Sequence, residues 1–224
     1  KDEDTCLQSK MLSRGIENAQ RAIEGRNFGI RKNVLQYDDV MNKQREVMYA
    51  ERMKVLKGED VHAQVVKFIP DFVRKVVSEA VNIDEMPEKW DETALNRALE
   101  NRLLPEGTNF ITREKLDRWD VEYAVDKITK ATEKAYEEKI EQVKAEFGID
   151  YADVERRFLL MNVDRNWIDQ IDAMDQLRKG IGLRAYGNVD PVISYKQEGF
   201  EMFDEMVERI QNTTIAMLLK VRIE

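Results

Sequence analysis

Paired acidic side chains are the first candidates for chemistry in this sequence. Asp172 and Asp175 lie three residues apart, so on a helix they would share a face and could in principle bind a cation. The alternative, which the sequence favours, is a solvated face of an acidic protein. Asp38 and Asp39 are adjacent and would point in different directions, which argues against a two-carboxylate mechanism there.

The other reactive residue types are too few for a familiar active site. His62 is the only histidine and Cys6 the only cysteine, which excludes a zinc site built from several Cys and His ligands. The sequence contains no Gly-x-Ser-x-Gly elbow and no phosphate-binding loop of the G-x-x-x-x-G-K-[ST] type. We therefore expect no catalytic, metal or cofactor site, and we interpret His62 as a helix-start or surface residue.

Composition and charge favour a soluble helical protein. The 224 residues include 36% charged and 42% hydrophobic residues, with 10 Gly and 4 Pro, a balance typical of helical proteins with few turns. The net charge of −8 argues against nonspecific binding to nucleic acid. Residues 1–58, 59–148 and 149–224 carry net charges of +3, −7 and −4, which suggests that the middle segment is a separate subdomain.

The single cysteine and the N-terminal sequence favour a reducing compartment. One cysteine forms no intramolecular disulfide, which fits a reducing environment. No apolar run approaches the roughly 18 residues of a membrane span, and the N-terminal KDEDTC lacks the features of a signal peptide. Because the sequence does not start with Met, we expect a fragment or a processed chain.

Apolar periodicity predicts an all-α fold. Val34, Met41, Met48 and Val55 recur every seven residues, which predicts one long helix that ends near 57–60 and needs partner helices to bury its seam. Turn signals at Met86-Pro87 and at 104–107 divide the middle segment into shorter helices. We expect one of these to open at 112–115 and to run to about Phe147.

The last segment predicts an antiparallel helical hairpin. One expected apolar stripe comprises Leu160, Val163, Trp167, Ile171, Met174 and Ile181, and the second comprises Phe200, Phe203, Val207, Ile210, Thr214, Met217 and Val221. The stretch LRAYGNVDP, residues 183–191, joins them. Gly187, Asn188 and Pro191 fit a turn, but Arg184 and Tyr186 have no role in making one. A scaffold of this kind suits mechanical or binding work better than catalysis.

Three stretches resemble the SecA preprotein translocase ATPase family. They are EGRNFGIRKNVLQYDDVMNKQREVMY at 24–49, WIDQIDAMDQLRKGIGLRAYGNVDP at 167–191 and YKQEGFEMFDEMVERI at 195–210. By this resemblance, residues 1–57 would form the long helix of the helical scaffold domain and 58–148 the helical wing domain. Residues 149–224 would form the two-helix finger and the remainder of the scaffold.

The resemblance also implies a function. The family couples ATP hydrolysis to the movement of unfolded preproteins through the SecYEG channel. The ATP and Mg sites belong to motor domains that this sequence lacks, so we expect no enzyme activity and no cofactor in this chain alone. The implied partners are SecYEG, unfolded preprotein, the protein's own motor domains and, peripherally, the inner face of the bacterial cell membrane, with a cytoplasmic location. The exposed seams are compatible with a homodimer, and no nucleic acid is expected.

Site residues follow from the resemblance position by position. Tyr186 matches the finger-tip tyrosine that contacts the translocating polypeptide, and Leu183, Arg184, Gly187 and Asn188 share the tip loop. Arg31 matches a long-helix arginine that touches the motor domains, and Asp38 lies two turns further on in the same match. The alternatives are an unrelated helical interaction scaffold and an accessory of a nucleic-acid motor, of which the latter conflicts with the negative charge.

Overall fold

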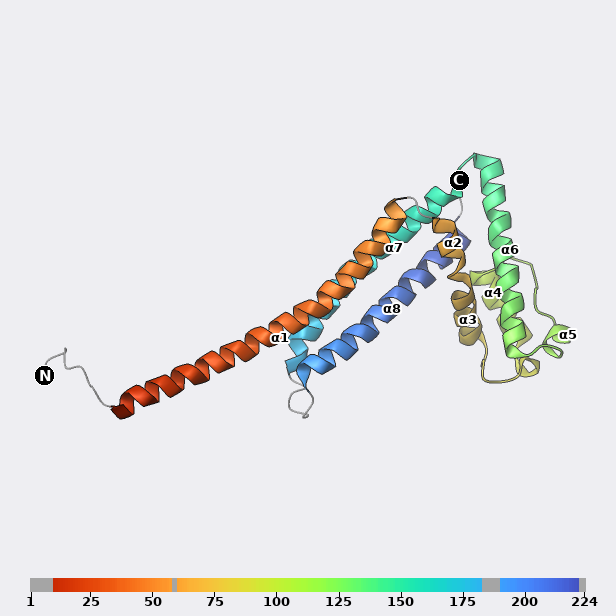
Figure 1. Ribbon diagram of the computed structural model, residues 1–224. Coiled ribbons are helices and arrows are strands. Elements are labelled where there is room, and N and C mark those ends of the chain that lie inside the picture. Colours follow the sequence, from red (N-terminus) through yellow and green to blue (C-terminus); the bar gives the residue numbers. More distant parts are fainter. Residues whose placement is uncertain (1–9, 58–59, 183–189, 222–224) are drawn as a thin grey trace. The chain divides into compact units, whose positions relative to one another are not determined.

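The fold is helical throughout the described part of the chain, as predicted. The computed structural model describes residues 10–57, 60–182 and 190–221 (Figure 1). Within these ranges every regular element is a helix, and no strand occurs. The helices are α1 (Lys10–Leu56), α2 (Val61–Val66), α3 (Ile69–Ala80), the 3-10 helix η1 (Pro87–Lys89), α4 (Glu92–Arg102), α5 (Arg113–Leu116), α6 (Val121–Phe147), α7 (Tyr151–Ile181) and α8 (Pro191–Lys220).

Aspartate side chains cap the start of five of these helices, the one before α7 being Asp150. Asp60 accepts a hydrogen bond from the Ala63 amide at 3.0 Å, and Asp120 accepts one from the Tyr123 amide at 2.7 Å. Asp91 and Asp190 play the same part before α4 and α8. Each carboxylate satisfies an N–H that has no partner inside its helix and lies at the positive end of the helix dipole.

The chain forms two compact units, and α1, α7 and α8 each contribute to both. The first unit contains 1–46 and 173–201, and the second contains 47–172 and 202–224. The boundaries predicted at 57/58 and 148/149 lie where α1 ends at Leu56 and α6 ends at Phe147. The long first helix and its end are therefore confirmed, whereas the three-domain division stays a prediction.

In the second unit, α3 packs between α4 and α6 (Figure 1). The α3 helix presents five fully buried apolar side chains to this core, and α4 and α6 add Leu95, Leu99 and Ile128. Asn96 holds the loop that follows α4, because its amide donates to the Ile111 carbonyl at 2.8 Å and its carbonyl accepts from the Ile111 amide at 2.9 Å. The five α3 core residues are Ile69, Phe72, Val73, Val76 and Val77.

One expectation about the middle segment changes. The predicted helix from 112 to 147 is wrong as one element, because α5 ends at Leu116 and α6 begins at Val121. The Asp120 side chain caps the new helix, and an N-cap residue has a non-helical backbone, with φ −87° and ψ 172° at Asp120.

The predicted apolar stripes are correct for most of α7 and wrong for much of α8. Val163, Trp167, Met174 and Ile181 are buried as expected, although Ile171 is 37% exposed. On α8 the predicted Ile210 and Thr214 are buried, but Phe200 is 65% exposed, and before Ile210 the buried stripe runs instead through Val192, Tyr195, Gly199 and Met206. Along α1, Met48 and Val55 are buried, whereas Val34 is 45% exposed. Periodicity alone cannot decide which of two neighbouring apolar stripes faces the partner helices.

Gly148 ends α6 with a left-handed backbone of φ 66° and donates its amide to the Lys144 carbonyl at 3.0 Å. We expect Gly148→Ala to lower the free energy of unfolding by about 1 kcal/mol, because a β-carbon strains this backbone conformation. Denaturant unfolding measures the change. Gly29→Ala is the matched control, since Gly29 lies inside α1 with open space around it and there alanine should not destabilise. Equal stability of Gly148→Ala and the parent chain would contradict the cap role.

Candidate functional site

The predicted tip residues Leu183, Arg184, Tyr186, Gly187 and Asn188 lie outside the described residues. Their assignment therefore remains a prediction. The structure describes the two ends that carry this loop. The α7 helix ends at Ile181, which is 2% exposed, and α8 begins at Pro191.

Asp190 fixes the start of α8. Its carboxylate accepts from the Val192 amide at 2.8 Å, and its carbonyl accepts from the Ser194 amide at 3.1 Å. Proline at the first helical position needs no hydrogen-bond partner for its nitrogen and has a fixed φ suited to a helix. The predicted corner residues Asp190 and Pro191 thus begin the second helix of the hairpin.

A group of polar and aromatic residues in the first unit, which we name the corner cluster, joins α1 to α7 and α8. Tyr37 of α1 meets Tyr195 of α8 edge-on, with 4.8 Å between the ring centroids. Asp38 lies 3.6 Å from Arg178 of α7, which also binds Asp175 at 3.1 Å. Burial, together with the nearby Asp190 carboxylate, raises the pKa of Tyr37, so its hydroxyl stays neutral. Asp38, predicted to couple to motor domains, thus contacts the first hairpin helix.

Asp175 does not form a cation site. Its carboxylate is bound by Lys179 at 2.6 Å and by Arg178, and these hydrogen bonds hold its pKa below the usual value. Among the described residues, no group of three His, Cys, Asp or Glu side chains could hold a metal ion. Asp172 is exposed, as expected for a solvated face, and the absence of a cation site stays a prediction.

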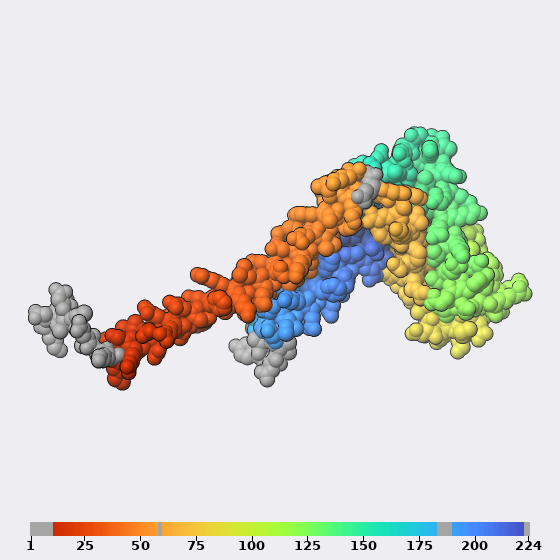
Figure 2. All heavy atoms as spheres, viewed as in Figure 1, coloured from red at the N-terminus to blue at the C-terminus, as the bar shows by residue number. Residues whose placement is uncertain are grey.

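The N-terminal half of α1 exposes an apolar stripe. Every residue from Met11 to Phe28 is exposed, in the part of α1 drawn in red in Figure 2. Ile16, Ile23 and Ile30 recur every seven residues and are 53%, 60% and 52% exposed. Arg31 follows on this exposed stretch and has no charged partner within the described residues. A stripe of this length is typical of a helix that packs on another element.

A second helix contact in the first unit involves residues that the sequence did not single out. The Gln44 amide donates to the Gly199 carbonyl at 2.7 Å, and both residues are buried. Gly199 lies at the fourth residue after Tyr195 on the buried stripe of α8. A glycine at a core position of a heptad pattern is the signal that could have indicated a close contact.

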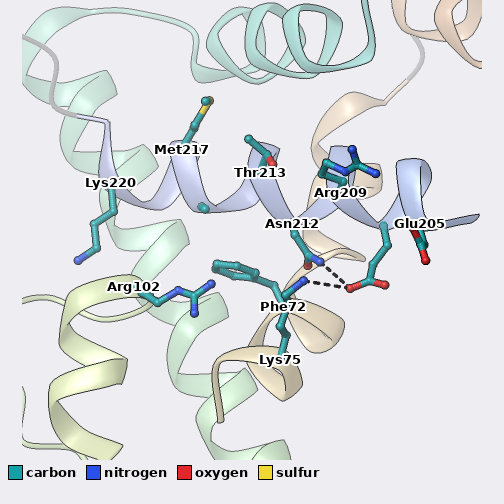
Figure 3. A pocket seen from close by; sticks show the side chains of 11 residues that line it. Phe72, Lys75, Arg102, Glu205, Arg209, Asn212, Thr213, Met217 and Lys220 are labelled. Carbon is teal, nitrogen blue, oxygen red and sulfur yellow. Dashed lines mark hydrogen bonds and ion pairs between the residues drawn. The ribbon is translucent and has the colours of Figure 1, made fainter. Parts of the chain in front are cut away.

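A cavity of about 720 Å³ in the second unit lies between α8 and the α3–α4 pair. Lys75 and Asn212 both donate to the Glu208 carboxylate, at 3.2 and 3.0 Å, and dashed lines mark interactions of Lys75 and Asn212 in Figure 3. Arg102 lies over the Phe72 ring, 5.2 Å from its centroid, and pairs with Glu79. Lys75, Glu208 and Arg102 therefore already have partners at this cavity, which Glu205 and Arg209 also line.

His62 lies in a network of carboxylates at the start of α2. Its Nδ1 is 2.9 Å from Glu155 and its Nε2 is 3.0 Å from Glu137. Glu155 is 1% exposed and also accepts a hydrogen bond from the Tyr136 hydroxyl at 2.6 Å. Burial alone would lower the pKa of His62, but the hydrogen bonds and charges of the two glutamates outweigh burial and raise it. The expected helix-start position is confirmed, with a structural role that the sequence did not indicate.

Trp167 is a packing residue, as predicted. Its side chain is 7% exposed and meets the Tyr49 ring with 6.5 Å between centroids. Arg52 and Asp164 form a two-point ion pair beside it, at 2.8 and 3.2 Å. Two parallel N–H···O bonds of this kind fix the relative position of the two helices better than one.

Comparison with known proteins identifies the family. The description "SecA Wing and Scaffold domain" matches residues 6–222. The chain belongs to the SecA family. It is 47% identical over its whole length to protein translocase subunit SecA 1 of Clostridioides difficile (strain 630), and 45% identical over 98% of its length to the same subunit of Alkaliphilus metalliredigens (strain QYMF). Protein translocase subunit SecA of Acetivibrio thermocellus is 44% identical over the whole chain.

The chain spans about a quarter of these SecA relatives, namely 24% of each. It therefore corresponds to the wing and scaffold part of a SecA-type translocase. None of the described helices combines the length and the apolar content that crossing a bilayer requires.

The His62 network predicts a pH-dependent stability. Because the folded pKa of His62 is raised, its stabilising contribution is complete below the ordinary value of about 6.5 and is lost as the pH rises through the folded pKa. We expect the difference in unfolding free energy between the parent chain and His62→Gln to be larger at pH 6 than at pH 8.

An NMR titration checks the cause directly, because this chain has a single histidine. The imidazole should titrate above its ordinary pKa, and Glu137→Gln should lower that midpoint. A midpoint at or below the ordinary value in the parent chain would contradict the network.

Proposed function

We propose that this chain is the scaffold, wing and finger part of a SecA protein-export motor. The motor domains of the longer protein would hydrolyse ATP, and this part would pass their movement to an unfolded preprotein entering the SecYEG channel. The family match over residues 6–222 is the observation that carries the proposal. The SecA relatives are named as subunits of a protein translocase.

The domain division belongs to this proposal. Residues 1–57 would be the long scaffold helix, 58–148 the wing, and 149–224 the finger with the rest of the scaffold. The chain carries no phosphate-binding loop motif, so ATP and Mg would bind only in the motor domains and this part alone would not be an enzyme. Its place would be the cytoplasmic face of the bacterial cell membrane, with peripheral contact.

The finger tip would be the polypeptide-binding site. Leu183, Arg184, Tyr186, Gly187 and Asn188 join two helices whose described ends are fixed by the buried Ile181 and by the Asp190 cap. A tyrosine offers a large contact area with few rotatable bonds and tolerates many partner sequences. This is the property that a handle for unrelated preproteins needs.

The exposed part of α1 would be the surface that meets the motor domains. It combines the stripe of Ile16, Ile23 and Ile30 with the exposed Arg31. An arginine can form a two-point bond to a carboxylate and release it when the partner changes state. Asp38, one to two turns beyond Arg31, would carry this contact to the first finger helix through Arg178, which lies 3.6 Å away.

For the tip, we expect Tyr186→Ala in the full-length protein to lower preprotein transport about tenfold, since loss of a central aromatic contact weakens binding by more than 1 kcal/mol. Transport into SecYEG-containing vesicles, measured together with ATP hydrolysis, tests this. Tyr186→Phe is the control, because it keeps the ring and should retain most of the transport. Normal transport by Tyr186→Ala would remove Tyr186 from the site.

For motor coupling, we expect Arg31→Glu to weaken the stimulation of ATP hydrolysis by preprotein and channel about three- to tenfold, because reversal of the charge repels a carboxylate partner. Steady-state ATPase assays with and without preprotein measure the ratio. Arg26→Glu, on the same exposed stretch, controls for charge reversal in general. An unchanged stimulation in Arg31→Glu would exclude Arg31 from coupling.

A further inference from the structure

The α8 helix comes unusually close to α1 and α7 at Gly199. A β-carbon built on Gly199 would lie 2.7 Å from the Met174 Cε atom, 3.3 Å from its sulfur and 3.6 Å from Val40 Cγ1. At the other described glycines, a β-carbon would meet no heavy atom within 4 Å. Gly199 is therefore the described glycine at which a side chain would disturb a contact between helices.

Gln44 attaches α1 to the backbone of α8 at the same place. Its amide donates to the Gly199 carbonyl at 2.7 Å, and its side chain is 6% exposed in total. Inside a helix this carbonyl also accepts the amide four residues on, and a carbonyl oxygen has a second lone pair for a further donor. The bond thus joins two helices without breaking either one. A hydrogen bond to the backbone follows any movement of the helix, whereas a hydrogen bond to a long side chain can be kept by rotation of that side chain while the helix moves.

Met174 closes the contact from α7. It is 1% exposed and packs its thioether against the position of Gly199. The edge-on pair Tyr37–Tyr195 lies two turns away along α1 and one turn away along α8. Three helices therefore meet around one glycine, and none can shift along its axis without displacing the other two.

The position of this contact suggests its use. Gln44 lies on the same continuous helix as the exposed residue Arg31, 13 positions further on, which corresponds to about 20 Å. Met174 and Gly199 lie on the two helices that carry the tip loop. The contact thus ties the helix that carries Arg31 to both helices that carry the loop, eight residues beyond the start of α8 at Pro191.

We propose that Gln44, Gly199 and Met174 form a joint that transmits displacement of α1 to both finger helices. This proposal rests on the proposed function. The three residues are positioning residues: they touch neither nucleotide nor preprotein, and they set how far movement of one helix moves the other two.

Gly199→Leu tests the joint in the full-length protein. The added side chain displaces Met174 and separates the helices, so the amount of preprotein transported per ATP hydrolysed should fall about tenfold. Gly180→Leu is the matched control, because Gly180 lies on α7 with open space around its β-carbon position. It should leave this ratio unchanged. The ratio is informative because misfolded molecules lose transport and hydrolysis together, which leaves the ratio unaltered.

Gln44→Leu provides an independent variant. It keeps the side-chain volume but removes the donor, so the fold should persist while transport per ATP falls about threefold. Gly199→Ala with Met174→Ala should recover part of the ratio lost in Gly199→Ala alone, because truncation of Met174 makes room for the methyl group.

Three outcomes test the joint, and a fourth tests the proposed tip role. A lowered ratio in both Gly199→Leu and Gln44→Leu, with Gly180→Leu normal, supports the joint. A normal ratio in these variants overturns the joint, and if Tyr186→Ala still impairs transport, the proposed function stands. An equal loss of transport and hydrolysis in Gly199→Leu shows a purely structural residue and also overturns the joint. Normal transport in Tyr186→Ala would count against the proposed tip role itself.

Discussion

An α-helix satisfies its own backbone hydrogen bonds, so helices hold to one another only through side chains and the few carbonyls that accept a second donor. The strands of a sheet are joined by backbone hydrogen bonds, but no strand occurs among the described residues of this chain. Helix pairs in the first unit therefore depend on a small number of close contacts. The approach at Gly199, with the Gln44 bond at 2.7 Å, is the tightest of them.

In the second unit, too, a few contacts between buried polar groups join neighbouring helices. The Asn162 amide of α7 donates to the Thr214 hydroxyl of α8 at 3.0 Å, and both residues are buried. Glu155 receives Tyr136 from α6 and faces His62 from α2. A buried polar group costs free energy unless its partner is in place. Such pairs thus favour one alignment of the helices over others that would bury as much apolar surface.

Helices and their ends could be read from the sequence more easily than the contacts between helices. The seven-residue repeat from Val34 to Val55 predicted α1, and Leu56 does end it. The α8 stripe was placed on Phe200, which is 65% exposed, because phenylalanine gives a strong apolar signal and Gly199 gives none. The buried position of Gln44 cannot be predicted for the same reason, because periodicity counts apolar residues and the Gln44 amide is polar. The turn itself follows from Gly187, Asn188 and Pro191, but the role of the tip is predicted by resemblance alone, because Arg184 and Tyr186 contribute nothing that the turn requires.

Whether a displacement can pass through the hairpin depends on how the strength of the joint compares with thermal energy. One buried hydrogen bond adds about 1 kcal/mol, and the fully buried Met174 side chain adds about 2 kcal/mol. Their sum of about 3 kcal/mol would leave the joint open in fewer than about one molecule in a hundred, since each 1.4 kcal/mol is a factor of ten. A joint that opens so rarely transmits most of a helix displacement, whereas a looser contact would absorb it. The close packing of Met174 depends on the absence of a side chain on Gly199, because a β-carbon there would lie 2.7 Å from the Met174 Cε atom and the end of that side chain would have to move.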